Sequence, residues 1–193
     1  LPLTSVFTVI IGSYMNTQMT YMLQEKKGGF GYAEDKVGFI ASELTIYSLP
    51  CSMAATAGAG YVFELLGRRW TLFVSYFSTS LLFFVIPYAP PSFAILVVCR
   101  CLIGVTMSAP LANPLIPDYI IKSSRARAIA LCGVGAVLGE VFSMGVLFNL
   151  TKSMTFENAF LVAGFFVMFC SFIILVLIKD PDMKNLRKDI ETK

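Results

Sequence analysis

Six long apolar segments, separated by short connectors, constrain this chain more than any other feature. At a rise of about 1.5 Å per residue, a helix of each length crosses the ~30 Å hydrocarbon layer of a bilayer. Backbone polar groups find no water in lipid, so the segments must be helical. We therefore expect an all-α, polytopic membrane protein whose six-helix bundle covers residues 1–178. The segments are residues 3–24, 37–62, 70–90, 92–116, 127–150 and 158–178.

Composition agrees with a chain that lies in lipid. Charged residues make up 14% of the sequence, against about 25% in soluble domains, and the mean hydropathy is +0.75. No basic stripe with interleaved aromatic residues suggests a nucleic-acid partner. The five cysteines lie in apolar segments, and the sequence has no histidine and no Cys-x-x-Cys pair. We therefore expect the bilayer as a partner, and neither a metal site nor a cofactor.

Basic residues are distributed unequally between the two ends of the expected bundle. Alternate connectors must lie on the same side of the membrane, and one side collects ten basic residues while the other collects four. Basic residues favour the cytoplasmic side. We expect that side, or its equivalent, to hold the second and fourth connectors and the tail of residues 179–193. Its basic residues are Arg68, Arg69, Lys122, Arg125, Arg127, Lys179, Lys184, Arg187, Lys188 and Lys193.

The connector between the second and third segments carries a recognisable pattern. The sequence Gly-Tyr-Val-Phe-Glu-Leu-Leu-Gly-Arg-Arg runs from Gly60 to Arg69, and we name it the signature loop. It resembles the loop motif of the major facilitator superfamily, G-x-L-a-D-r-x-G-R-r/k. Glu64 stands where the family usually has Asp and keeps the charge. Val62 and Leu65 depart from the common Leu and the frequently basic residue.

Three further matches follow in the order that the family has them. Arg100 with Gly104 is similar to the R-x-x-x-G pattern of the fourth helix. The stretch from Asp118 to Ala126 is similar to E-x-x-P-x-x-x-R-G, with the acid and Arg125 at the family spacing but without its Pro and Gly. Gly135-x-x-x-Gly139 resembles the antiporter motif, but Glu140 replaces the expected Pro. The antiporter motif is thus incomplete.

The resemblance implies a transporter built of two six-helix halves with the substrate between them. This chain supplies the first half, and residues 179–193 resemble the start of the linker to a second half, in the same chain or in a partner chain. We expect secondary transport of a sugar-like solute or an organic anion, with or without proton coupling. The alternative is a non-transporting subunit that acts as a scaffold in a larger membrane complex. An enzyme is disfavoured, because the sequence lacks histidine, Gly-x-Ser-x-Gly and a Walker-type loop.

The resemblance also implies a cytoplasmic gate. In the family, acidic and arginine residues at this end latch one conformation and release it in the other. The alternative for the two arginines Arg68 and Arg69 is a topology anchor at the lipid headgroups. Asp118 and Arg125 would form a companion latch. The expected gate residues are Gly60, Glu64, Gly67, Arg68, Arg69, Asp118 and Arg125.

Three ionisable residues lie at membrane depth, where charges are costly and usually functional. Helical rise places Glu43 roughly 9 Å, Arg100 roughly 12 Å and Glu140 roughly 15 Å from the outer ends of their segments. All three could meet near the midplane. The group would orient an anionic substrate or couple binding to protonation; alternatively, Arg100 and Glu140 form a structural pair.

The first segment carries a polar stripe of Ser13, Asn16, Thr17, Thr20 and Gln24 at helical spacing. Lipid does not favour such a face, so it should look toward other helices or a water-filled cavity. Asn16, Thr17 and Thr20 are candidates for hydrogen bonding to a solute, the alternative being interhelical hydrogen bonds. Tyr47, one turn from Glu43, is a weaker candidate.

Overall fold

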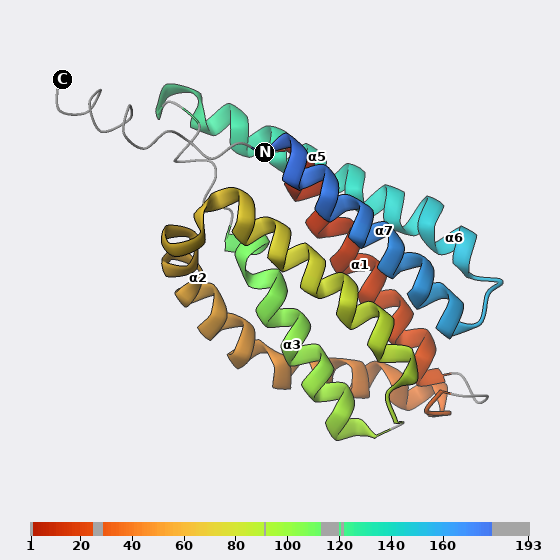
Figure 1. Cartoon of the computed structure of the whole chain (residues 1–193). Helices are drawn as coiled ribbons and strands as arrows, with labels where there is room; N and C mark the ends of the chain where they lie inside the picture. Colours follow the sequence, from red (N-terminus) through yellow and green to blue (C-terminus); the bar gives the residue numbers. More distant parts are fainter. Residues whose placement is uncertain (1, 25–28, 91, 113–119, 121, 179–193) are drawn as a thin grey trace, which may run out of the picture.

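A computed structural model describes residues 2–24, 29–90, 92–112, 120 and 122–178. Regular structure within these residues is entirely helical. The elements lie roughly along one axis and form a bundle (Figure 1). In chain order they are α1 (Pro2–Gln24), α2 (Glu34–Val85), η1 (Ile86–Tyr88), α3 (Phe93–Ala112), η2 (Lys122–Ser124), α5 (Arg125–Phe142), the π-helical turn η3 (Ser143–Leu147), α6 (Phe148–Thr151) and α7 (Phe156–Leu177).

Helix α2 folds back on itself at a single residue. Gly67 has φ 79° and ψ 168° and is the non-helical position inside the 52-residue helix. Residues that carry a Cβ rarely adopt such a positive φ, so glycine permits the reversal. The second and third apolar segments are therefore the two arms of α2 (Figure 1). The expected connector of residues 63–69 is much shorter in the structure, because helix continues up to Gly67 and resumes directly after it.

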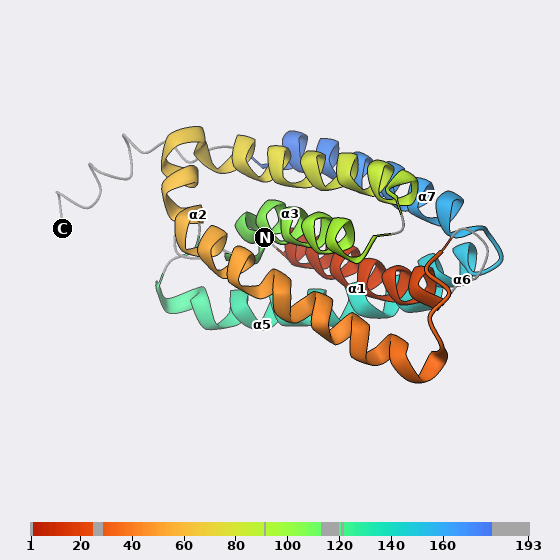
Figure 2. The ribbon, with the colours of Figure 1, turned by 90° about the horizontal axis from the view of Figure 1, so that it is seen from below.

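The two arms enclose α3, and α1 lies at the centre of the bundle. In Figure 2 the arms of α2 run on opposite sides of α3. Helix α1 contacts α2, α3, α5 and α7. The bend of α2, the N-terminus and the start of α5 gather at one end, and α6 lies at the other (Figure 1). Side chains on different faces of α1 therefore meet different helices.

Four helical stretches of the described chain are long and apolar enough to cross a membrane. The first contains both arms of α2. Helix α1 has 23 residues, but its polar side chains keep it out of this set. Large apolar residues remain exposed on the outside of the bundle, such as Val137 at 64% and Val176 at 74%, as expected for a surface in contact with lipid. The stretches are Asp35–Tyr88, Phe93–Leu111, Arg125–Thr151 and Phe156–Leu177.

Buried hydrogen bonds hold α1 to its neighbours. The Tyr76 hydroxyl lies 2.6 Å from Thr8 Oγ1 and donates to the Thr4 carbonyl at 3.1 Å. At the other end, Tyr14 Oη and Gln18 Nε2 lie 3.0 and 3.1 Å from Thr151 Oγ1. Lipid provides little hydrophobic drive for helix association, so such contacts and close packing hold the helices together.

Close packing between α5 and α1 depends on a missing side chain. A Cβ added at Gly139 would lie 2.7 Å from the Val6 carbonyl oxygen, a distance that requires the backbone to move. Gly135, one turn earlier, is also buried. The Gly135-x-x-x-Gly139 pattern thus lies where α5 crosses α1.

We predict that Gly139→Ala destabilises the protein by about 1–3 kcal/mol, the usual range for overpacking. The measurement is the thermal unfolding midpoint of the detergent-solubilised protein. Gly133→Ala on the same helix is the matched control, because a Cβ there meets nothing within 4 Å. Equal midpoints for the two variants would contradict the close approach of α5 to α1.

Candidate functional site

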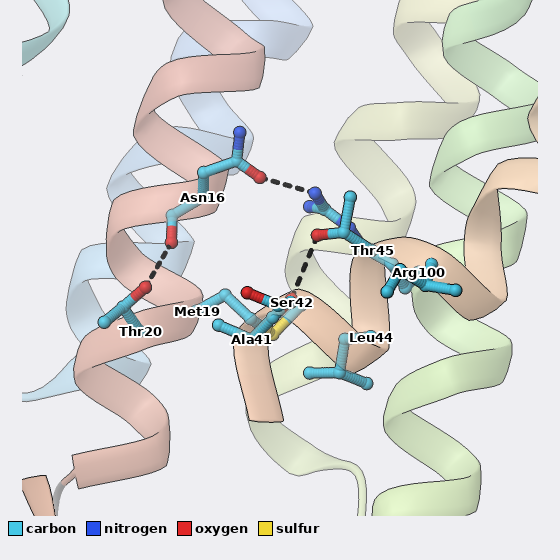
Figure 3. Close-up of a pocket in the computed structure, with 9 residues that line it drawn as sticks. Asn16, Met19, Thr20, Ala41, Ser42, Leu44, Thr45 and Arg100 are labelled. Atoms are coloured by element: carbon cyan, nitrogen blue, oxygen red, sulfur yellow. Dashed lines mark hydrogen bonds between the residues drawn. The ribbon is translucent and has the colours of Figure 1, made fainter. Parts of the chain in front are cut away.

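A pocket of about 410 Å³ lies between α1, α2 and α3. Side chains from all three helices converge on it (Figure 3). Two of the expected solute-binding residues of α1, Asn16 and Thr20, line it together with Arg100 of α3. The whole lining is Asn16, Met19, Thr20, Ala41, Ser42, Leu44, Thr45, Ile46 and Arg100.

Arg100 reaches from α3 to α1 across this pocket. Its Nη2 donates to Asn16 Oδ1 at 2.5 Å (Figure 3). Its Nη1 donates to Met15 Sδ at 3.4 Å. The side chain is partly buried. A guanidinium has five N–H donors in a rigid fork, so these two contacts leave donors for a ligand. Arg100 is also the charged residue among those that line the pocket.

Hydroxyl groups form the rest of the polar lining. Thr20 donates to the Asn16 carbonyl at 2.9 Å, Ser42 to the Gly38 carbonyl at 2.8 Å and Thr45 to the Ala41 carbonyl at 3.0 Å. Each hydroxyl proton is thus held by the helix's own backbone, which leaves the oxygen lone pairs as acceptors. A ligand with a negative group for Arg100 and donors for these oxygens would match the lining.

Within the described chain, no ion pair joins the three charges that we expected to meet. Arg100 contacts Asn16 and Met15, and within the described chain it pairs with neither Glu43 nor Glu140. Glu140 on α5 does not reach Arg100 on α3 because α1 packs between these two helices. Its neighbour Gly139 faces α1, and the next side chain on a helix turns away by about 100°, so Glu140 is exposed. Glu43 is partly buried beside Leu44 but outside the pocket lining.

Two other expected site residues also lie outside the pocket lining. Thr17 donates to the Ser13 carbonyl at 3.0 Å and contacts Met144 Sδ at 3.6 Å, so it faces η3. Tyr47 is 54% exposed and its ring meets Phe93 edge-on at 6.2 Å. In contrast, Ser42 and Thr45 were missed by the sequence analysis, although their spacing places them on one face of the second segment.

The signature loop forms the bend of α2. Gly67 makes the reversal, Arg68 lies 5.2 Å from the centroid of the Phe63 ring, and Gly60 and Glu64 are exposed. Arg69 Nε donates to the Leu175 carbonyl at 2.7 Å. The last carbonyls of a helix lack partners within it and carry partial negative charge. Arg69 therefore ties the bend of α2 to the end of α7.

The expected companion latch is only partly described. Arg125 opens α5, and its Nε donates to the Ile120 carbonyl at 3.3 Å. Asp118 lies outside the described residues, so the pairing of Asp118 with Arg125 stays a prediction.

Comparison with known proteins identifies the family. The sequence model of the Major Facilitator Superfamily matches residues 3–193. The chain belongs to the Major Facilitator Superfamily. The sequence is also 24% identical over 191 residues to "Probable anion transporter 6" of Oryza sativa subsp. japonica. That alignment covers 94% of this chain and 44% of the relative. The chain thus spans less than half the length of the curated relative it matches.

Membership of the Major Facilitator Superfamily confirms the broad expectations from the sequence. The chain is an integral, multi-pass membrane protein of this family. Its all-helical architecture and its four apolar stretches agree with this assignment.

We predict that Arg69→Ala slows solute uptake and leaves membrane insertion intact, because it removes the contact between α2 and the end of α7. Arg69→Lys separates the two interpretations of this residue. Lysine keeps the positive charge of a headgroup anchor but lacks the Nε–H that reaches Leu175. Slowed uptake in both variants favours a gate; normal uptake in the lysine variant would leave Arg69 as an anchor only. The measurements are the initial uptake rate and the amount of protein in the membrane fraction.

Proposed function

We propose that this chain forms the first six-helix half of a transporter for a small organic anion. The observation that carries the proposal is Arg100, which presents a cation to the pocket between α1, α2 and α3. A guanidinium recognises a carboxylate or phosphate with two parallel hydrogen bonds. The anion would be held by Arg100 and oriented by Asn16 and the hydroxyl groups of the lining.

Electrostatics favours an anion over a neutral sugar. An arginine at membrane depth is costly and is retained where it meets a partner or a ligand. Its partners in the described chain, the Asn16 amide and the Met15 thioether, are neutral and cannot balance the charge, whereas a bound anion would. The name of the rice relative, an anion transporter, supports the same choice.

A count of the helical passes supports the proposed six-helix half. Helix α1, the two arms of α2, α3, the run from α5 to α6, and α7 would cross the bilayer in turn. Six passes return both ends to one side, and the excess of basic residues favours the cytoplasm or its equivalent for the bend of α2. The other half of the substrate site would come from a second six-helix unit, in the same chain or in a partner.

Transport would follow from rocking of the two halves. A solute shifts the balance between two conformations only by its difference in affinity for them. We infer that Arg69 and the end of α7 stabilise one conformation at the cytoplasmic side, and that Arg100 binds the anion with different strength in each. The scaffold alternative is disfavoured by the transporter relative and by the polar pocket.

We propose proton coupling as a second property of the same transporter. Glu140 is exposed on α5 and Glu43 is partly buried on α2, and both lie at membrane depth in the proposed topology. A carboxylate that binds a proton in one conformation and releases it in the other would link uptake to a proton gradient.

We predict that Arg100→Gln raises the KM for anion uptake about 10- to 100-fold, the loss expected for charge-assisted hydrogen bonds. Arg100→Lys should recover part of the affinity, because it keeps the charge without the fork. Arg127→Gln is the matched control, since Arg127 is exposed on α5 away from the pocket. An unchanged KM in Arg100→Gln would remove Arg100 from the substrate site.

We predict that Glu140→Gln changes the pH dependence of uptake, because the amide cannot exchange a proton. The measurement is the initial uptake rate across external pH, with Glu157→Gln as the control at an exposed position in the first turn of α7. A pH profile identical to that of the unmodified protein would exclude Glu140 as the coupling residue.

A further inference from the structure

Two cysteines lie on α2 and α3, two of the helices that line the pocket. Cys51 on α2 is exposed and Cys101 on α3 is partly exposed, whereas Cys99, Cys132 and Cys170 are buried. Cys101 directly follows the pocket residue Arg100 in the chain. These two thiols are therefore the accessible ones among the five.

The side chains of the two cysteines are neighbours. Cys101 Sγ lies 3.9 Å from the Tyr47 carbonyl oxygen, and this carbonyl belongs to the turn of α2 that precedes Cys51. The Cys51 side chain lies close enough to the Cys101 thiol for the two to interact electrostatically. The Cys101 thiol therefore faces α2 at the level of Cys51.

The backbones of α2 and α3 approach closely at this level. A Cβ added at Gly104 would lie 3.1 Å from Ser52 Cβ and 3.9 Å from the Ser48 carbonyl oxygen. Ser52 is next to Cys51, and Gly104 is one turn after Cys101. Disulfides join Cα atoms that are about 4.4–6.8 Å apart, a separation that helices reach where a glycine lies in the contact.

We propose that Cys51 and Cys101 are a redox-active thiol pair that closes to a disulfide between α2 and α3. With a peroxide as the oxidant, one thiolate attacks an oxygen atom and becomes a sulfenic acid, and one water is released. The second thiol then displaces the sulfenic oxygen as another water. In sum, the two thiols lose two hydrogens and two electrons, and the peroxide is reduced to two waters.

The disulfide would stiffen one wall of the anion pocket. Thr45 and Ile46 on α2 and Arg100 on α3 line the pocket within two turns of the two cysteines. A bond between the helices prevents the α2 wall from adjusting to a ligand held by Arg100. Both helices belong to the same half, so rocking of the halves is not restrained. This consequence, unlike the disulfide itself, rests on the proposed anion transport.

The disulfide can be tested by peptide mapping of the full-length protein in membranes. The sample is treated with hydrogen peroxide, the remaining thiols are blocked with N-ethylmaleimide, and the protein is digested with trypsin. Cleavage after Arg100 separates Cys101 from Cys99, so the two thiols fall on different peptides. The relevant peptides are residues 37–68 with Cys51, 70–100 with Cys99 and 101–122 with Cys101.

The proposal predicts a linked species of peptides 37–68 and 101–122, two hydrogens lighter than their sum and separable by dithiothreitol. Cys51→Ser and Cys101→Ser should each lose this species, and Cys132→Ser should retain it. Separate maleimide adducts on Cys51 and Cys101 in the oxidised, unmodified chain would overturn the proposal, and this result does not depend on how any variant folds.

Uptake by the same samples tests the effect on the pocket. Oxidation should raise the KM, leave the maximal rate unchanged, and be reversed by dithiothreitol; Cys51→Ser should be insensitive to the oxidant. A linked peptide with an unchanged KM would overturn the effect on the pocket. If no anion is taken up before oxidation, the proposed function fails, while the peptide map still decides the disulfide.

Discussion

Polar side chains of helix α1 serve two purposes, and the bundle depends on both. Thr8 and Tyr14 make buried hydrogen bonds to two other helices, with Tyr76 and Thr151. In lipid such bonds help to fix the positions of the helices. Asn16 instead contacts Arg100 in an open pocket. The buried bonds thus hold in place the helix that carries Asn16, as a preorganised site requires.

The bend at Gly67 and the contact of Arg69 connect the fold with its proposed movement. Gly67 reverses α2, and Arg69, two residues later, reaches the final turn of α7. The same short segment thus determines where the two arms of α2 lie and which helix end they touch. Each pass through the bilayer satisfies its own backbone, whereas contacts between helix ends can be exchanged at smaller cost. This difference is why we place the gate at the bend rather than within the apolar segments.

The sequence predicted the helical, membrane-spanning class because length and apolarity are properties of each segment alone. The grouping of Arg100, Asn16 and Thr20 could be predicted in part from the sequence, since each residue is unusual at membrane depth. The meeting of Arg100 with Glu43 and Glu140 was not found, because depth along a helix does not specify rotation about its axis or which helix lies between. The buried bonds of Tyr14 and Tyr76 were missed for a related reason: an isolated tyrosine in an apolar segment does not indicate its partner. The sequence predicted a seven-residue connector, but the structure reverses the chain at Gly67 alone. A single residue with positive φ is enough for such a reversal, and in the sequence it is visible only as one glycine.

The most direct test of the account is solute uptake by the full-length gene product in proteoliposomes. Radiolabelled organic anions and neutral sugars would be compared side by side, with and without an inward proton gradient. The account predicts saturable uptake of an anion and no uptake of sugars. Uptake of a neutral sugar in preference to every anion would contradict the role given to Arg100. Absence of all uptake by folded protein would contradict the account as a whole and favour the scaffold.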